Sequence, residues 1–135
     1  MKKKLIQYFA CAIAAMLLLL VACSPSVSWV LVDNSDSGDA VKLCINSELI
    51  IDLESNATTG FQWEVVEVSE QGIIEKVNNE YNAPEAGAPV GAGGIERWTF
   101  KALNEGTTRL YMEYSQPWQG GTKAAETFTL IVIVE

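Results

Sequence analysis

Side chains that usually carry out enzyme chemistry are scarce in this chain. The 135 residues include no histidine, so neither a serine nor a cysteine nucleophile can be paired with an imidazole base. The carboxylates are scattered along stretches of alternating polarity, as solvent-facing side chains of strands are, and they do not follow the spacing of an EF-hand calcium loop. The sequence therefore predicts a protein that is not an enzyme and that has no cofactor and no metal site.

Three short segments instead combine residue types that are suited to binding. They are Asn56-Ala57-Thr58-Thr59-Gly60-Phe61, Val90-Gly91-Ala92-Gly93-Gly94 and Gln116-Pro117-Trp118. Each segment by itself has an ordinary structural explanation: a tight turn, a flexible connection, and an aromatic ring folded over the end of a core. The glycine-rich stretch lacks the lysine and the strand-to-helix context of a phosphate-binding loop.

The elements that position these segments are predicted to be strands. Apolar and polar residues alternate with period two wherever the chain is apolar, and turn residues separate the runs. We expect an all-β, immunoglobulin-like antiparallel β-sandwich of about eight strands. The predicted strands cover residues 29–32, 41–45, 49–54, 61–65, 73–79, 97–101, 109–114 and 127–134.

The order of the strands predicts where the three segments meet. They fall in alternate connections, and in an antiparallel sandwich successive connections switch between the two ends. All three segments are therefore expected at one edge, where they would form a binding surface much as antibody loops do. An enzyme is the least favoured class of protein for such an arrangement.

The N-terminus carries a predicted targeting segment. Lys2, Lys3 and Lys4 precede an apolar stretch over residues 5–22, which is typical of a signal peptide. A transmembrane helix is the alternative, but the stretch ends at Leu20-Val21-Ala22-Cys23, which resembles the lipobox of bacterial lipoproteins. The predicted organisation is a signal peptide over residues 1–22, a lipidated Cys23 and tether over 23–28, and one domain over 29–135.

This organisation predicts a location in the cell envelope, with the lipid on Cys23 inserted in a bacterial membrane. Ser24, rather than an aspartate, follows the lipidated cysteine and resembles outer-membrane sorting in Gram-negative cells. Because Cys11 leaves with the signal peptide and Cys23 takes lipid, we expect no intramolecular disulfide in the mature chain. Cys44 is then expected to be a small buried hydrophobe.

Charge argues against nucleic acid as a partner. The net charge is −8, and loss of residues 1–22 removes three lysines and no acidic residue, which makes the mature domain more acidic still. Phosphate binding needs clustered Lys or Arg, and the remaining basic residues are dispersed. We therefore expect a monomeric, acidic domain that does not bind nucleic acid.

The three segments together resemble the loops of chagasin-like inhibitors of papain-type cysteine peptidases. That family carries an Asn-Pro-Thr-Thr-Gly-Tyr/Phe loop, a Gly-X-Gly-Gly loop and an Arg-Pro-Trp/Phe loop, in this order, on an immunoglobulin-like sandwich. The resemblance extends from about Val41 to the C-terminus. Two positions depart from the pattern, because Ala57 stands where the family has proline and Gln116 where it has arginine.

The resemblance implies a reversible, noncovalent inhibitor of papain-like cysteine peptidases. Thr58 and Thr59 would lie over the catalytic cysteine of the peptidase, and Gly60 would allow a close backbone approach. The glycine-rich segment would run beside the substrate groove, Val90 would fill an apolar pocket, and Trp118 would be an aromatic anchor. The alternative is a membrane-anchored immunoglobulin-like lipoprotein that binds another envelope or extracellular ligand, either glycan or protein.

Overall fold

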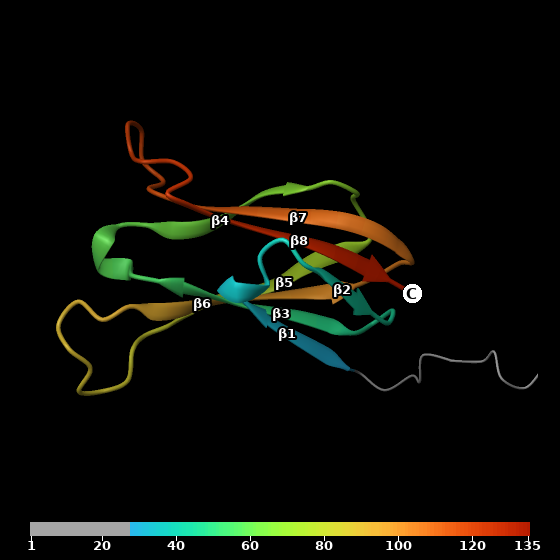
Figure 1. Cartoon of the computed structure of the whole chain (residues 1–135), viewed down its shortest axis with the longest axis horizontal. Coiled ribbons are helices and arrows are strands. Elements are labelled where there is room, and N and C mark those ends of the chain that lie inside the picture. Colours follow the sequence, from blue (N-terminus) through green and yellow to red (C-terminus); the bar gives the residue numbers. More distant parts are fainter. Residues whose placement is uncertain (1–27) are drawn as a thin grey trace, which may run out of the picture.

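The computed structural model describes residues 28–135, which form eight strands and two short 3-10 helices (Figure 1). The all-β prediction is confirmed, and each predicted strand range overlaps an observed strand. The predicted signal peptide, lipidated Cys23 and most of the tether lie outside the described residues. The elements are β1 (Trp29–Asp33), η1 (Asn34–Asp36), β2 (Ala40–Leu43), β3 (Glu48–Ser55), η2 (Ala57–Thr59), β4 (Gln62–Val68), β5 (Ile74–Asn82), β6 (Gly94–Ala102), β7 (Gly106–Ser115) and β8 (Glu126–Val134).

The strands form two four-stranded sheets that face each other as a sandwich (Figure 1). One sheet has the order β1-β3-β6-β5 and the other β2-β8-β7-β4. Each inner face comes from the period-two alternation, which is clearest in β6, β7 and β8. The largest fully buried apolar side chains are Leu49, Ile51, Leu53, Phe100, Leu110, Met112, Phe128, Leu130 and Val132.

The sheets are mixed, so the prediction of a purely antiparallel sandwich is wrong for two strand pairs. β1 runs parallel to β3, and β2 runs parallel to β8, while the other pairs are antiparallel. Alternation identifies a strand and its buried face, but it carries no information about the direction of the neighbouring strand. η1 joins β1 in one sheet to β2 in the other and is capped by Asp33.

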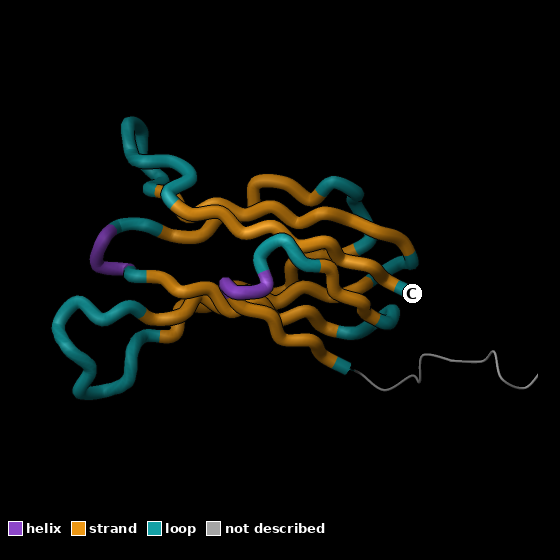
Figure 2. The backbone as a smooth tube through the Cα atoms, viewed as in Figure 1, coloured by secondary structure: helices purple, strands orange, loops and turns teal. Residues whose placement is uncertain are grey.

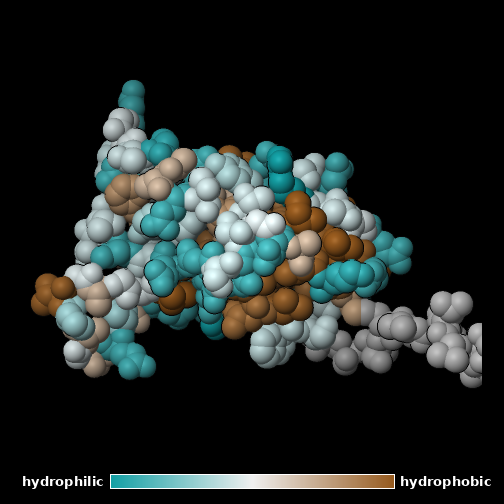
Figure 3. Space-filling view, viewed as in Figure 1, coloured by the Kyte–Doolittle hydropathy of each residue, from teal (hydrophilic) through white to brown (hydrophobic). Residues whose placement is uncertain are grey.

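The prediction that the three segments share one end of the sandwich agrees with the structure. The β3–β4, β5–β6 and β7–β8 connections project together on the left of Figures 1 and 2. The described chain enters β1 at the opposite end, where the C-terminus also lies. The broadest hydrophobic area in Figure 3 lies away from the three connections.

Cys44 does not match its predicted role. It directly follows β2, is half-buried rather than buried, and is disulfide-bonded. The prediction that Cys44 is a buried hydrophobe is therefore wrong, while the absence of an intramolecular disulfide from the mature chain stays a prediction.

None of the helices in residues 28–135 is long and apolar enough to cross a membrane. The same residues contain no group of three or more His, Cys, Asp or Glu side chains arranged to hold a metal ion.

Candidate functional site

The candidate site is the end of the sandwich that carries three loops. Loop 1 is residues 56–61, loop 2 is residues 83–93, and loop 3 is residues 116–125. They connect β3 to β4, β5 to β6 and β7 to β8, and Figure 2 shows them side by side at one end. All the predicted binding residues lie in these loops except Gly94, which begins β6.

Loop 1 is folded around the side chain of Asn56. Its Oδ1 accepts hydrogen bonds from the Thr58 amide at 3.1 Å and from the Thr58 hydroxyl at 2.7 Å. The Thr59 hydroxyl donates to the Asn56 carbonyl at 2.7 Å. This is an N-cap arrangement, and it holds η2 in one 3-10 turn. Thr58 and Thr59 are exposed, yet both hydroxyl protons point back into the loop.

The base of loop 1 rests on an aromatic cluster. The backbone amide of Asn56 donates to the Tyr114 hydroxyl at 2.8 Å. The Tyr114 ring lies 5.2 Å from the Phe61 ring and 5.3 Å from the Trp63 ring, and such aromatic pairs stabilise beyond the area they bury. Phe61 is partly buried against the core, so in this structure it supports loop 1 from below.

Loop 1 also contacts loop 3 through Gly60 and Trp118. Gly60 has φ of +75°, a conformation that L side chains rarely adopt. A Cβ placed on Gly60 would lie only 2.5 Å from Cη2 of Trp118, so the indole packs directly over the glycine. Trp118 is half exposed and lies outside the hydrophobic core. The structure therefore does not place this ring over the end of the core.

Asn56 links loop 1 to loop 2 as well. Its Nδ2 donates to the carbonyl of Gly91 at 3.0 Å. One side chain thus satisfies the turn of loop 1 and also fixes the position of the glycine-rich segment. Together with the packing of Trp118 on Gly60, this bond joins the three loops into one surface before any partner arrives.

Loop 2 projects farther and has fewer contacts. Its tip is a turn closed by a 3.0 Å hydrogen bond from the Ala92 amide to the Pro89 carbonyl, and Gly91 has φ of +87°. Val90 at this tip is fully exposed. Gly94 is buried in β6, where a Cβ would collide with the Asn82 carbonyl and the Tyr81 ring. Gly94 is therefore needed for strand packing rather than for an exposed surface.

Loop 3 is closed at its base by Gln116. The backbone amide of Gln116 donates to the Thr122 carbonyl at 2.8 Å, and the side-chain Oε1 of Gln116 accepts from the backbone amide of Thr122 at 3.0 Å. The ammonium of Lys123 donates to the Gln116 carbonyl at 2.8 Å. Gln116, which stands where the chagasin-like loop pattern has arginine, therefore has an internal role, because it holds the two sides of loop 3 together at its base.

A buried carboxylate beneath loop 1 was not predicted from the sequence. Glu96 accepts a hydrogen bond from the Ser55 hydroxyl at 2.7 Å, and its two oxygens each lie 3.2 Å from the backbone amide of Trp63. It therefore ties β6 of one sheet to β4 of the other. In the sequence, Glu96 falls at the same alternate positions as Trp98 and Phe100, which places its side chain on the same inward face of β6.

Ionisable groups contribute little at the tip of the site. Loop 1 contains none, and the groups with displaced pKa values lie outside the three loops. The Ser35 hydroxyl and amide lower the pKa of Asp33, and the ion pair with Asp52 raises the pKa of Arg97. The hydrogen bond to Glu113 raises the pKa of Tyr111. Recognition by loop 1 therefore depends on shape and hydrogen bonding rather than on charge.

Comparison with known proteins adds independent evidence. Residues 42–132 match the model of the chagasin family peptidase inhibitors, I42. The chain is 29% identical over 102 residues to chagasin of Trypanosoma cruzi, covering 73% of this chain and 92% of chagasin.

Solved structures agree in fold. A cysteine protease inhibitor of Entamoeba histolytica superposes with a TM-score of 0.72 at 23% identity, covering 82% of this chain and 99% of that one. PbICP-C, solved in complex with falcipain-2, superposes with a TM-score of 0.52 at 21% identity, covering 82% of this chain and 93% of that one. Since the family model spans about two thirds of the sequence, including all three loops, this chain belongs to the chagasin family of peptidase inhibitors.

Proposed function

We propose that this protein inhibits papain-like cysteine peptidases by inserting loop 1 into the active-site cleft while loops 2 and 3 contact the rims on either side. The observation that carries the proposal is the linkage of the three loops through Asn56 and through Trp118 on Gly60. A surface that is ordered before binding loses less conformational entropy in the complex. Membership of an inhibitor family also confirms that the chain is not an enzyme.

The chemistry of loop 1 suits a noncovalent block. Thr58 and Thr59 are exposed at the turn, and their hydroxyl protons are already donated within the loop. Loop 1 contains no cysteine and no ionisable group, so it offers no activated nucleophile to the peptidase. It would occupy the cleft by shape and leave intact when the complex dissociates.

Loops 2 and 3 would supply contacts on the two sides of the cleft. Gly91, Ala92 and Gly93 would pair their backbone with an extended segment of the peptidase, a mode that small residues permit. Val90 would enter an apolar pocket beside them. Trp118 is half exposed and, with Pro117 and Gln116 beneath it, would be the aromatic anchor on the other side.

Inhibition assays with a papain-like peptidase test this proposal directly. The expected result is reversible, active-site-directed inhibition with one inhibitor bound per peptidase, and recovery of full activity after dilution. This proposal also expects a monomer, which sedimentation of the purified protein would check. Failure to inhibit several papain-like peptidases at micromolar concentration would favour a sandwich that binds another envelope ligand.

We also propose that the protein is a lipoprotein whose residues 1–22 are removed and whose Cys23 carries lipid in a bacterial membrane. The lipobox-like Leu20-Val21-Ala22-Cys23 supports this. The point of entry into β1 also supports it, because this point lies opposite the three loops (Figure 1). A tether there would hold the inhibitory loops away from the membrane, and sorting to the outer membrane is expected in a Gram-negative cell.

Lipidation at Cys23 can be tested on protein extracted from membranes. Mass spectrometry of protein extracted from membranes should find the first residue to be lipidated Cys23. A mature chain that begins elsewhere, or that retains an internal disulfide, would contradict the proposal.

A further inference from the structure

Three exposed apolar side chains lie toward the end of the sandwich opposite the three loops (Figure 1). Trp29 and Leu31 on β1 are 64% and 49% exposed, and Ile45, in the turn between β2 and β3, is exposed as well. The backbone amide of Glu48, where this turn ends, donates to the Ser28 carbonyl at 2.9 Å and so holds the turn beside the start of β1. Single exposed apolar residues are ordinary on protein surfaces, whereas groups of them mark contact sites.

Trp29 and Leu31 belong to an apolar patch on the outer face of their sheet. Alternation turns Val32 into the core and leaves Trp29 and Leu31 outside. Leu31 pairs in register with Ile50 of β3, which is half-buried on the same face. β1 is the edge strand of this sheet, and Figure 3 shows hydrophobic surface over β1 and β3. Trp29, Leu31 and Ile50 together form the β1 patch.

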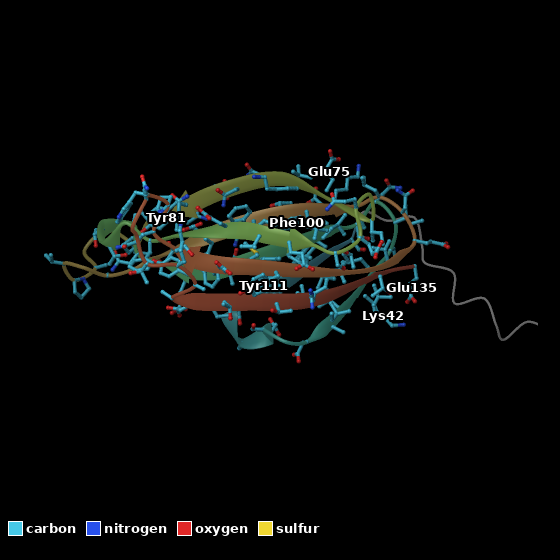
Figure 4. All side chains as sticks on the ribbon, turned by 90° about the horizontal axis from the view of Figure 1, so that it is seen from above. Lys42, Glu75, Tyr81, Phe100, Tyr111 and Glu135 are labelled. Carbon is cyan, nitrogen blue, oxygen red and sulfur yellow. The ribbon has the colours of Figure 1, made fainter. Side chains whose placement is uncertain are left out.

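Two pairs of opposite charges lie at the same end as the β1 patch. Glu48, which pairs with Trp29 in register, lies opposite Lys101 on β6. The ammonium of Lys42 lies 3.3 Å from a carboxylate oxygen of Glu135, and Figure 4 shows this pair at the end where the C-terminus lies. Binding to anionic lipid needs clustered Lys or Arg, so a surface with paired charges suits zwitterionic lipid instead.

The chain that enters β1 limits how far Trp29 can lie from a lipid on Cys23. Five residues, 24–28, separate the two. Because an extended chain spans at most about 3.6 Å per residue, Trp29 lies within roughly 22 Å of Cys23. A cysteine that carries lipid lies at the membrane surface. The β1 patch of a lipidated protein is therefore held next to the bilayer.

Lipid suits the β1 patch better than a second copy of this chain. Tryptophan is enriched at membrane–water interfaces, where the ring is buried and the indole N–H stays close to water. A stable dimer needs about 800 Å² from each partner, and three partly exposed side chains supply much less. The β1 patch alone is too small for a lasting contact between copies, but it can enter the headgroup region beside an anchor that already holds the protein there.

We propose that the β1 patch lies in the headgroup region of a zwitterionic membrane surface, with Trp29 deepest. The proposal rests on the lipid anchor at Cys23 proposed above and adds a second contact, which sets the orientation of the domain. Loops 1, 2 and 3 then point away from the bilayer. Loss of the contact leaves the inhibitory loops intact, because the β1 patch shares no residue with them.

Fluorescence quenching in vesicles tests the contact. Lipidated protein purified from membranes is reconstituted into phosphatidylcholine vesicles that carry a nitroxide either near the headgroup or near the end of the acyl chain. We expect the shallow nitroxide to quench part of the tryptophan emission and the deep one to quench much less. Trp29→Phe should remove this quenching, and Trp118→Phe should retain it, because Trp118 lies at the loop end. Trp63 and Trp98 are buried and should contribute little.

A polar substitution within the patch tests its apolar character. Leu31→Asn should reduce the shallow quenching and shift the Trp29 emission to longer wavelength. Val77→Asn is the matched control, because Val77 is an exposed apolar residue on β5, outside the patch, and it should change neither. Both variants should keep the wild-type Tm and the wild-type Ki for a papain-like peptidase. An effect of Val77→Asn equal to that of Leu31→Asn would count against the patch.

Mass spectrometry of the same samples separates the contact from the anchor. Protein without lipid would refute both together, whereas lipidated protein with unquenched Trp29 would refute only the contact. Quenching that appears only after the protein is diluted in the vesicles would show that copies of the chain cover the patch instead. Saturation with a papain-like peptidase should leave the quenching unchanged, and its loss on peptidase binding would overturn the proposed orientation.

Discussion

Loops 1 and 3 differ from loop 2 in how strongly the rest of the molecule holds them. Loop 1 is capped by Asn56 and rests on Tyr114, while loop 3 is closed by Gln116 and packs Trp118 on Gly60. Loop 2 is joined to this pair by one side-chain hydrogen bond from Asn56, and its tip is fully exposed. The difference suggests that loops 1 and 3 supply most of the affinity, and that loop 2 adjusts to individual peptidases.

The largest expected effect comes from removing the aromatic ring that joins loops 1 and 3. Trp118→Ala should weaken inhibition by at least about 2 kcal/mol, roughly thirtyfold in Ki, because aromatic anchors dominate interfaces of this kind. Most of the loss should appear as faster dissociation in stopped-flow or surface-binding kinetics.

Trp29 provides a matched control for this substitution. It is also an exposed tryptophan, but it lies on β1, away from the three loops. Trp29→Ala should leave Ki unchanged. Because Trp118 lies outside the core, its replacement should lower Tm little, and unfolding of Trp118→Ala or an unchanged Ki would refute its role as an anchor.

Asn56 is the next most sensitive position, and two variants separate its roles. Asn56→Ala removes both the cap of η2 and the bond to Gly91, so we expect a loss of about 1–2 kcal/mol in binding. Asn56→Asp keeps a capping oxygen but replaces the donor to Gly91, and it should cost about 1 kcal/mol or less. Titration of both variants against the same peptidase gives the comparison. Equal losses would show that the cap of η2 contributes nothing to binding, and no loss with Asn56→Asp would show that the link to loop 2 contributes nothing.

Ala57→Pro tests whether loop 1 can be made more rigid. Asn56 has an extended backbone, with φ of −124° and ψ of 94°, as a residue before proline requires, and η2 begins at Ala57, where proline is tolerated. We expect Ki to be unchanged or improved by up to about 1 kcal/mol. Ala57→Gly should change Ki in the opposite direction. A substantial loss with proline and a normal Tm would mean that loop 1 must adapt on binding.

Val90→Ala is expected to have the smallest average effect and the largest variation between targets. The side chain makes few contacts in the free protein, so Tm should not change. Its effect on Ki should stay within about 1 kcal/mol and differ from one papain-like peptidase to another, since one apolar side chain in a pocket has this order of effect. Val77→Ala, an exposed valine on β5, is the control. An equal loss in Ki across all the peptidases would show that Val90 contributes to general affinity rather than to specificity.

Much of the site could be located before the structure was known, because its parts are local. The turn residues of loop 1, the glycines of loop 2 and the Pro-Trp of loop 3 are visible as short segments, and alternation places strands between them. Their roles were less predictable. Phe61 and Gly94 stand in the motifs, yet the structure uses Phe61 to support Tyr114 and Gly94 to pack β6 against β5.

The sequence by itself determined about eight strands, the buried face of the clearly alternating ones, the shared end of the three loops and the absence of a histidine-based catalytic site. These follow from short-range periodicity, chain order and composition. Only the tertiary structure decided the parallel placement of β1 and β2, the bond from Asn56 to Gly91, the packing of Trp118 on Gly60 and the β1 patch. Each of these depends on residues far apart in the chain, whose approach is fixed by how the two sheets pack rather than by any local pattern.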